Sequence, residues 1–174
     1  MKSSIDLFIH QDGKGPKVLT VSESDTVQAI LERAGVTKPG DYRLTIVDDA
    51  AVLDDESADH HPNHDDTLLP QTIEAKKVKH GSHLFCHHCR KVSVTVFYKH
   101  CSSEVELPPR VRIRRLLKWA LKEFKLSDED VKNLYLSVSG QKLGARPTQH
   151  LGEFVKPPIC EVSFDLLPNP KING

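Results

Sequence analysis

One order of predicted strands and helices occurs twice along the 174 residues, and this repetition constrains the fold more than any other feature. The second copy carries the clearer signal, a helix that follows Pro108-Pro109. Its apolar residues recur at the i, i+3, i+4, i+7 and i+11 spacing of a buried helix face, namely Ile113, Leu116, Leu117, Ala120 and Phe124. A two-strand hairpin precedes this helix in the pattern, and three further strands follow it.

In the first copy, alternation of apolar and polar residues predicts strands at residues 5–9, 17–21, 42–47, 51–53 and 82–88. A helix is expected to begin at a capping box formed by Asp25 and Gln28, with Gly35 ending it. The acidic, histidine-bearing stretch 54–81 has only Leu68, Leu69 and Ile73 to anchor it, so we expect a long surface loop.

In the second copy the same reasoning predicts strands at residues 91–98, 104–107, 134–138, 141–143 and 160–167, with turns at 100–103 and at Ser139-Gly140. A hairpin crossed by one helix and completed by later strands is the β-grasp arrangement. We therefore expect an α+β chain of two tandem β-grasp domains, residues 1–89 and 90–168, followed by an extended tail at 169–174.

Composition places this chain among ordinary soluble proteins. Residues 1–89 hold 9 Lys/Arg and 15 Asp/Glu, the remainder 15 and 9, so two oppositely charged halves of one neutral chain could attract each other. This balance argues against a uniformly basic nucleic-acid binder. No apolar run approaches the length of a bilayer span, and four scattered cysteines are unlike a secreted disulfide framework. We expect a cytoplasmic monomer with no membrane partner.

The end of the sequence carries the feature most suggestive of function. The last predicted strand leads into Pro168-Asn169-Pro170-Lys171-Ile172-Asn173-Gly174. Proline lacks an N–H and holds φ near −65°, so this stretch should neither form a helix nor pair as a central strand. A terminal glycine has no Cβ, and its carboxylate can therefore enter a narrow cleft. The alternative is that Gly174 marks nothing more than the end of the sequence.

The second copy resembles ubiquitin, with its helix, the hairpin Leu136-Ser137-Val138-Ser139-Gly140-Gln141-Lys142-Leu143 and the terminal glycine in step. Two such domains in tandem resemble the interferon-induced two-domain modifiers of vertebrates. The short junction Leu84-Phe85-Cys86-His87-His88-Cys89-Arg90-Lys91-Val92 and the neutral, proline-rich tail are more similar to BilA-type modifiers, the two-domain family of the bacterial Bil antiphage operons. The resemblance covers nearly the whole chain.

The resemblance implies a ubiquitin-like modifier, joined through the Gly174 carboxylate to target amines. A ubiquitin-activating-like enzyme would adenylate that carboxylate and capture it as a thioester, and a conjugating enzyme would pass it to a lysine. A JAB-type metalloprotease would trim a precursor or reverse the bond. These enzymes would grip Pro168, Asn169, Pro170, Lys171, Ile172 and Asn173, and the implied targets are phage virion components. The modifier itself would contribute no catalytic residue, metal or cofactor.

The chain departs from ubiquitin in two places. A single glycine follows Ile172-Asn173, whereas ubiquitin-type tails usually end in two glycines preceded by arginines. The outward positions that would carry ubiquitin's apolar recognition patch are Ser137, Glu161 and Ser163. We therefore expect dedicated partners.

Three other signals have both a functional and a structural interpretation. Cys86 and Cys89 have the spacing of half a zinc site, with only His100 and Cys101 as a second pair, and strand residues near the domain junction are the preferred interpretation. His60, His61 and His64 could collect a divalent ion, although a solvated acidic loop explains them as well. The cationic residues of the second helix could bind phosphate, but they have no interleaved aromatic residues: Arg110, Arg112, Arg114, Arg115, Lys118 and Lys122.

Neither a phosphate-binding glycine loop nor a nucleophile with a nearby base is evident, so we predict that the chain is not an enzyme. Cys160 is expected on an inward strand position as a core thiol, and Trp119 either lines the domain junction or is partly buried within its own domain. Two alternatives to a conjugated modifier stay open. One is an adaptor with ubiquitin-like domains that is never conjugated, and the other is a sulfur carrier whose terminal glycine becomes a thiocarboxylate.

Overall fold

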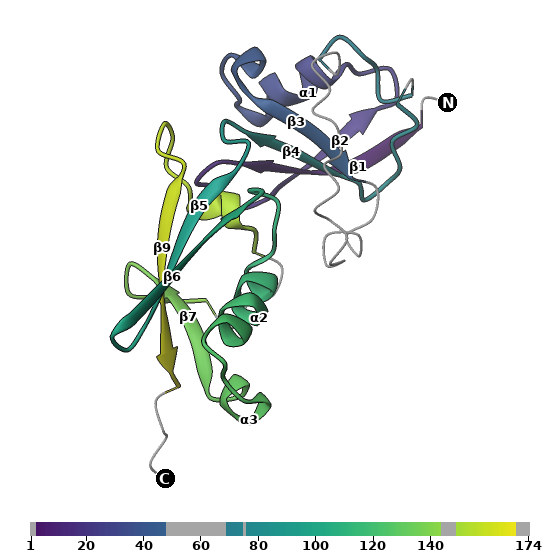
Figure 1. Cartoon of the computed structure of the whole chain (residues 1–174). Helices are drawn as coiled ribbons and strands as arrows, with labels where there is room; N and C mark the ends of the chain where they lie inside the picture. Colours follow the sequence, from purple (N-terminus) through teal and green to yellow (C-terminus); the bar gives the residue numbers. More distant parts are fainter. Residues whose placement is uncertain (1–2, 48–68, 75, 144–148, 170–174) are drawn as a thin grey trace.

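The computed structural model describes residues 3–47, 69–74, 76–143 and 149–169, and these form two separate sheets (Figure 1). The predicted strand at 51–53, Leu68 and the histidines at 60, 61 and 64 lie outside the described residues. The first sheet has the strand order β2-β1-β4-β3. Its elements are β1 (Ser4–Gln11), β2 (Lys17–Ser22), α1 (Val27–Ala34), η1 (Pro39–Asp41), β3 (Arg43–Val47) and β4 (His83–His87).

The two central strands of the first sheet run parallel, since β1 pairs with β4 from Phe8 opposite His83 to Gln11 opposite Cys86. The hairpin partner β2 and the later strand β3 flank them in antiparallel register. The alternation predicted for β1 is confirmed, because one face of it packs with α1 into a core that is almost fully buried: Leu7, Ile9, Val27, Ile30, Leu31 and Leu84.

The predicted start of α1 was one residue early. Thr26 is the N-cap, and its hydroxyl accepts a hydrogen bond from the N–H of Ala29 at 3.2 Å. Asp25 instead accepts from the N–H of Ser22 and pairs with Arg33. The predicted end is confirmed, since Gly35 adopts a left-handed φ of 87° and donates its N–H to helical carbonyls.

The described end of the predicted long loop is packed against the first domain. Ile73 is fully buried, Leu69 and Val78 pack against the same core, and Thr72 forms an isolated bridge with Thr26. The N–H of Ile73 donates to the carbonyl of Asp25 at 3.1 Å. The buried side chain of Ile73 and these backbone hydrogen bonds therefore fix the described end of the loop beside the start of α1.

The second sheet repeats the arrangement with one more strand, in the order β6-β5-β9-β7-β8. Its central pair, β5 and β9, is again parallel, from Ser93 opposite Glu161 to Phe97 opposite Asp165. The elements are β5 (Val92–Tyr98), β6 (Cys101–Leu107), α2 (Ile113–Glu123), α3 (Asp128–Val131), β7 (Leu134–Val138), β8 (Gln141–Lys142), η4 (Leu151–Phe154) and β9 (Glu161–Pro168).

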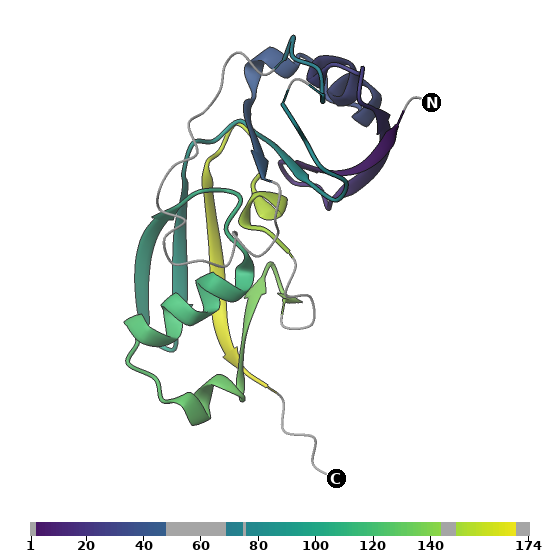
Figure 2. The ribbon, with the colours of Figure 1, turned by 90° about the vertical axis from the view of Figure 1, so that its right-hand side faces the viewer.

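Helix α2 crosses one face of the second sheet (Figure 2). The predicted stripe faces that sheet, with Ile113, Leu116 and Ala120 buried, and with Leu117 and Phe124 packed at its edge. Trp119 is partly buried in this same core, which is the second of the two positions expected for it. Ser139 and Gly140 both have positive φ, as the predicted tight turn between β7 and β8 requires. The β5–β6 turn is shorter than predicted, because Cys101 already pairs with Tyr98.

Each half of the chain is therefore a hairpin, a crossing helix and later strands around a central parallel pair. The predicted α+β fold of two tandem β-grasp domains is confirmed. None of the helices in the described part of the chain is long and apolar enough to cross a bilayer.

Candidate functional site

The C-terminal strand β9 runs one residue further than the proline rule predicts. Pro168 belongs to β9 and lies opposite Leu134 of β7. The pairing of β9 with β5 stops earlier, at Asp165 opposite Phe97, so the last residues of β9 have a partner on one side only. A proline is tolerated there because its missing N–H faces an unpaired edge.

Asn169 fastens the end of β9 to the domain. Its N–H donates to the carbonyl of Asn133 at 2.6 Å, and its side-chain amide donates to the carbonyl of Lys132 at 3.2 Å. The Nζ of Lys142 donates in turn to Asn169 Oδ1 at 2.6 Å. Pro168 and Asn169 are therefore part of the folded domain, which shortens the predicted free tail. Residues 170–174, including Gly174, lie outside the described residues.

The face of the second sheet opposite α2 carries a mixed surface beside this exit point. Glu161 and Ser163 are exposed there, as predicted, but Ser137 is only 2% exposed. Two large apolar side chains are exposed instead, Phe97 on β5 and Leu167 on β9. Their registers, Phe97 opposite Asp165 and Leu167 opposite Tyr135, place both on this outer face. The face is less polar than the sequence suggested.

The two domains meet where the turn after β1 contacts η4. The N–H of Gly13 donates to the carbonyl of Gly152 at 2.9 Å across the junction. The η4 segment is itself held by backbone bonds from Leu151 to Val111 and from Gly152 to Pro109. A Cβ at Gly152 would overlap the imidazole of His87, so only glycine allows this close approach.

A buried carboxylate lies at the centre of the first domain's side of the junction. Asp12 accepts hydrogen bonds from His87 Nδ1 at 2.7 Å, from His88 Nδ1 at 2.9 Å and from the backbone N–H of His88 at 2.8 Å. Burial alone would raise the pKa of Asp12, but these hydrogen bonds outweigh it and hold the pKa below its ordinary value. Asp12 therefore stays ionised and fixes the chain at the end of β4.

Buried histidines from both domains pack beside this carboxylate. His10 on β1 stacks on Phe85, and the ring of His150 from the second domain meets it edge-on with the centroids 4.7 Å apart. Burial lowers the pKa of His10 to about 2, with nearby His150, His83, His87 and Arg112 acting in the same direction. His10 is thus a neutral imidazole in the core of the junction.

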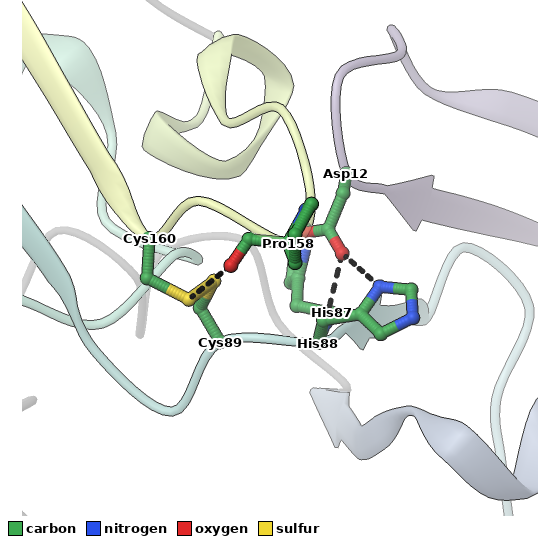
Figure 3. The surroundings of a disulfide bond; sticks show 6 residues. All are labelled: Asp12, His87, His88, Cys89, Pro158 and Cys160. Carbon is green, nitrogen blue, oxygen red and sulfur yellow. Dashed lines mark hydrogen bonds and ion pairs between the residues drawn. A yellow bond between two sulfur atoms is a disulfide. The ribbon is translucent and has the colours of Figure 1, made fainter.

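A disulfide between Cys89 and Cys160 closes the junction on the side of the second domain, with the Cα atoms 5.7 Å apart (Figure 3). It joins the start of β5 to the start of β9, and the N–H of Ser93 donates to the Cys160 carbonyl beside it. Cys160 packs against the second core as predicted, but it lies just before β9 and forms a disulfide, because the parallel pairing of β5 and β9 brings residues 71 positions apart together.

The structure does not bring the predicted half zinc site together. Cys86 is buried in the first core, where burial and the nearby Asp12 raise the pKa of its thiol well above the ordinary range. Cys89 is used in the disulfide, and Cys101 with His100 lies at the β5–β6 turn, where Cys101 is exposed. The structure thus agrees with the preferred interpretation of Cys86 and Cys89 as residues at the domain junction.

Sequence reasoning placed the junction but missed the buried Asp12 and histidine cluster within it. A signal was present, because the short run that leads from the first domain into the second, residues 83–88, contains three of these histidines: His83, His87 and His88. His10 and His150 gave no local warning, because each is a single polar residue in an ordinary strand or loop. On α2, the cations Arg114, Lys118 and Lys122 are exposed, as a solvated outer face requires.

Comparison with known families identifies the second domain. Residues 93–169 match the model of BilA ubiquitin-like domain 2. The second domain is therefore a ubiquitin-like domain of the BilA type. The matched span runs from β5 to Asn169, so it covers the second domain up to the point where the described residues end. The sequence has no significant match among curated proteins.

Solved structures similar to this chain include ubiquitin-like domains that align with about half of it. The ubiquitin of Caldiarchaeum subterraneum is 16% identical with a TM-score of 0.38, and the alignment covers 48% of this chain and 99% of that one. A ubiquitin-like domain of an Arabidopsis thaliana protein is 19% identical with a TM-score of 0.39, and the alignment covers 49% and 85% of the two chains.

Proposed function

We propose that this BilA-type protein is a modifier that is joined through the Gly174 carboxylate to amines of target proteins. The observation that carries the proposal is the match of residues 93–169 to a BilA ubiquitin-like domain, at the end of which the chain leaves its sheet from a fixed point. The three hydrogen bonds of Asn169 define that point.

The chemistry needs enzymes that supply what the modifier lacks. A carboxylate becomes electrophilic only after it gains a leaving group, so an activating enzyme must first form an acyl-adenylate at Gly174 and then a thioester. A conjugating enzyme would transfer the acyl group to a lysine, and a JAB-type metalloprotease would cleave precursors or conjugates. We propose phage virion components as targets, a cytoplasmic setting, and no catalytic role for the modifier itself.

The outer face of the second sheet supports recognition by such an enzyme. Phe97 and Leu167 are 45% and 38% exposed and lie on the sheet that ends in the tail. We propose that an activating enzyme that holds residues 170–174 also contacts these two side chains. The enzyme would then bind the tail and the outer face of the sheet together, and it would distinguish this modifier from others with a similar tail.

The test combines the chain, ATP and a candidate activating enzyme, and looks for a thioester adduct between the two proteins that a thiol reagent cleaves. We expect the adduct with the intact chain and none after removal of Gly174. A Phe97→Ser variant should form the adduct more slowly, while the exposed-surface control Lys122→Ser should react normally. The proposal would be contradicted if the adduct formed equally fast without Gly174, or if the intact chain formed no adduct with any candidate activating enzyme. In that case the adaptor alternative becomes the better account.

A further inference from the structure

We propose that His10, His150 and Glu153 bind a zinc ion that joins the two ubiquitin-like domains. One potential ligand atom from each of these residues lies within 4.8 Å of the other two. His10 comes from β1 of the first domain, whereas His150 and Glu153 come from the η4 region of the second. An ion bound by all three would therefore connect elements that share no sheet.

The spacing is close to what zinc requires. Bonds of about 2.0–2.1 Å to nitrogen and oxygen place tetrahedral ligand atoms roughly 3.4 Å apart. Starting from separations of no more than 4.8 Å, each atom needs to move inward by less than about an ångström, which rotation of a ring or carboxylate can supply. Two imidazoles and one carboxylate form a common zinc ligand set, with water in the fourth position.

Histidine ring nitrogens without hydrogen-bond partners lie buried at the junction, where a metal ion could bind them. His10 and His150 are each 2% exposed. Within the described part of the chain, His10 Nδ1 and both ring nitrogens of His150 are buried without a hydrogen-bond partner, and Glu153 Oε1 lies 3.7 Å from His150 Nδ1. Buried polar groups in folded proteins nearly always have a partner, so three such nitrogens at one contact call for an explanation. A metal ion would satisfy one nitrogen on each ring.

The surroundings orient the proposed ligands. His10 Nε2 lies 2.8 Å from His83 Nδ1, and when His10 donates in this bond the lone pair on its Nδ1 is free for a metal. Glu153 Oε1 accepts from the backbone N–H of His150 at 3.0 Å, which holds the carboxylate beside the imidazole.

The charged residues around the proposed zinc site are Arg112 and Glu153, which have opposite effects on cation binding. The guanidinium of Arg112 is close enough to act on both His10 and His83, and it opposes a second cation. Arg112 has an interaction of its own, and the Glu153 carboxylate supplies the compensating negative charge within the cluster. We therefore expect zinc binding to depend on Glu153 as much as on the histidines. Mixed nitrogen and oxygen ligands favour zinc over magnesium, which prefers oxygen alone.

The experiment uses the full, untagged chain, stripped with a chelator and titrated with zinc chloride in a calorimeter. We expect one zinc per chain at this site and a higher thermal unfolding midpoint with zinc, but not with magnesium. Glu153→Gln should weaken zinc binding at least tenfold. Glutamine keeps an oxygen that can accept the His150 N–H, so this variant should still fold. His150→Gln serves as the second variant.

The acidic segment offers the matched control. A triple variant, His60→Ala with His61→Ala and His64→Ala, should keep the site and its affinity. If zinc binding is lost in the triple variant and unchanged in Glu153→Gln and His150→Gln, the site at the junction is wrong. An absence of zinc binding by the folded wild-type chain overturns it equally. Cobalt provides an independent readout, because tetrahedral coordination should give visible absorption that Glu153→Gln abolishes.

Discussion

Breaking the disulfide between Cys89 and Cys160 should loosen the second domain by an amount that the structure allows us to estimate. The bond closes a loop of 71 residues, since that is the sequence separation of the two cysteines. In the chain-entropy model, opening a loop of that length costs roughly 4 kcal/mol of stability at 25 °C. Measured effects are often smaller, so we expect a loss of about 2–4 kcal/mol.

The chain contains a convenient probe for this measurement. Its single tryptophan, Trp119, packs in the second core, so fluorescence during urea unfolding reports the domain that the disulfide spans. The oxidised wild-type chain should unfold at higher urea than the same chain in dithiothreitol. The Cys89→Ser/Cys160→Ser double variant should match the reduced wild type and ignore dithiothreitol. Cys101→Ser, which alters an exposed free cysteine, should behave like the wild type in both conditions.

Two results would refute this reasoning. Mass spectrometry of the oxidised chain could find four free thiols, in which case the pairing is wrong. Alternatively, dithiothreitol could reduce the bond without shifting the Trp119 transition, in which case the loop is already restrained in the unfolded chain. The experiment also bears on the proposed cytoplasmic setting, because stable disulfides are rare in reducing compartments.

Three further predictions test other parts of the structure. Gly152→Ala should destabilise the junction by about 1–3 kcal/mol, measured by thermal unfolding, because the new methyl group overlaps the His87 ring; an unchanged midpoint would contradict the close approach. In native protein at neutral pH, maleimide should label Cys101 and spare Cys86, whose buried thiol has a raised pKa, and peptide mass spectrometry would show equal labelling if this is wrong. Asn169→Ala should cost about 1 kcal/mol or less and speed hydrogen exchange at the end of β9, while an unchanged exchange rate would show that these side-chain bonds do not hold the exit point.

Much of the fold follows from patterns that act over a few residues. The helical stripe from Ile113 to Phe124 places α2 against a sheet, and Gly35 and Ser139-Gly140 mark the ends and turns where positive φ is needed. Each of these signals depends only on neighbours within one element. They sufficed to predict two β-grasp domains, and the tail was predicted from the identity of its residues.

The site at the junction was decided by tertiary structure alone. His10 meets His150 and Cys89 meets Cys160 only after the domains pack and β5 aligns with β9. Pro168 enters a strand because the neighbouring β5 happens to end before it does. Contacts between residues separated by 70 or more positions depend on how whole sheets are placed, and no local periodicity encodes that placement.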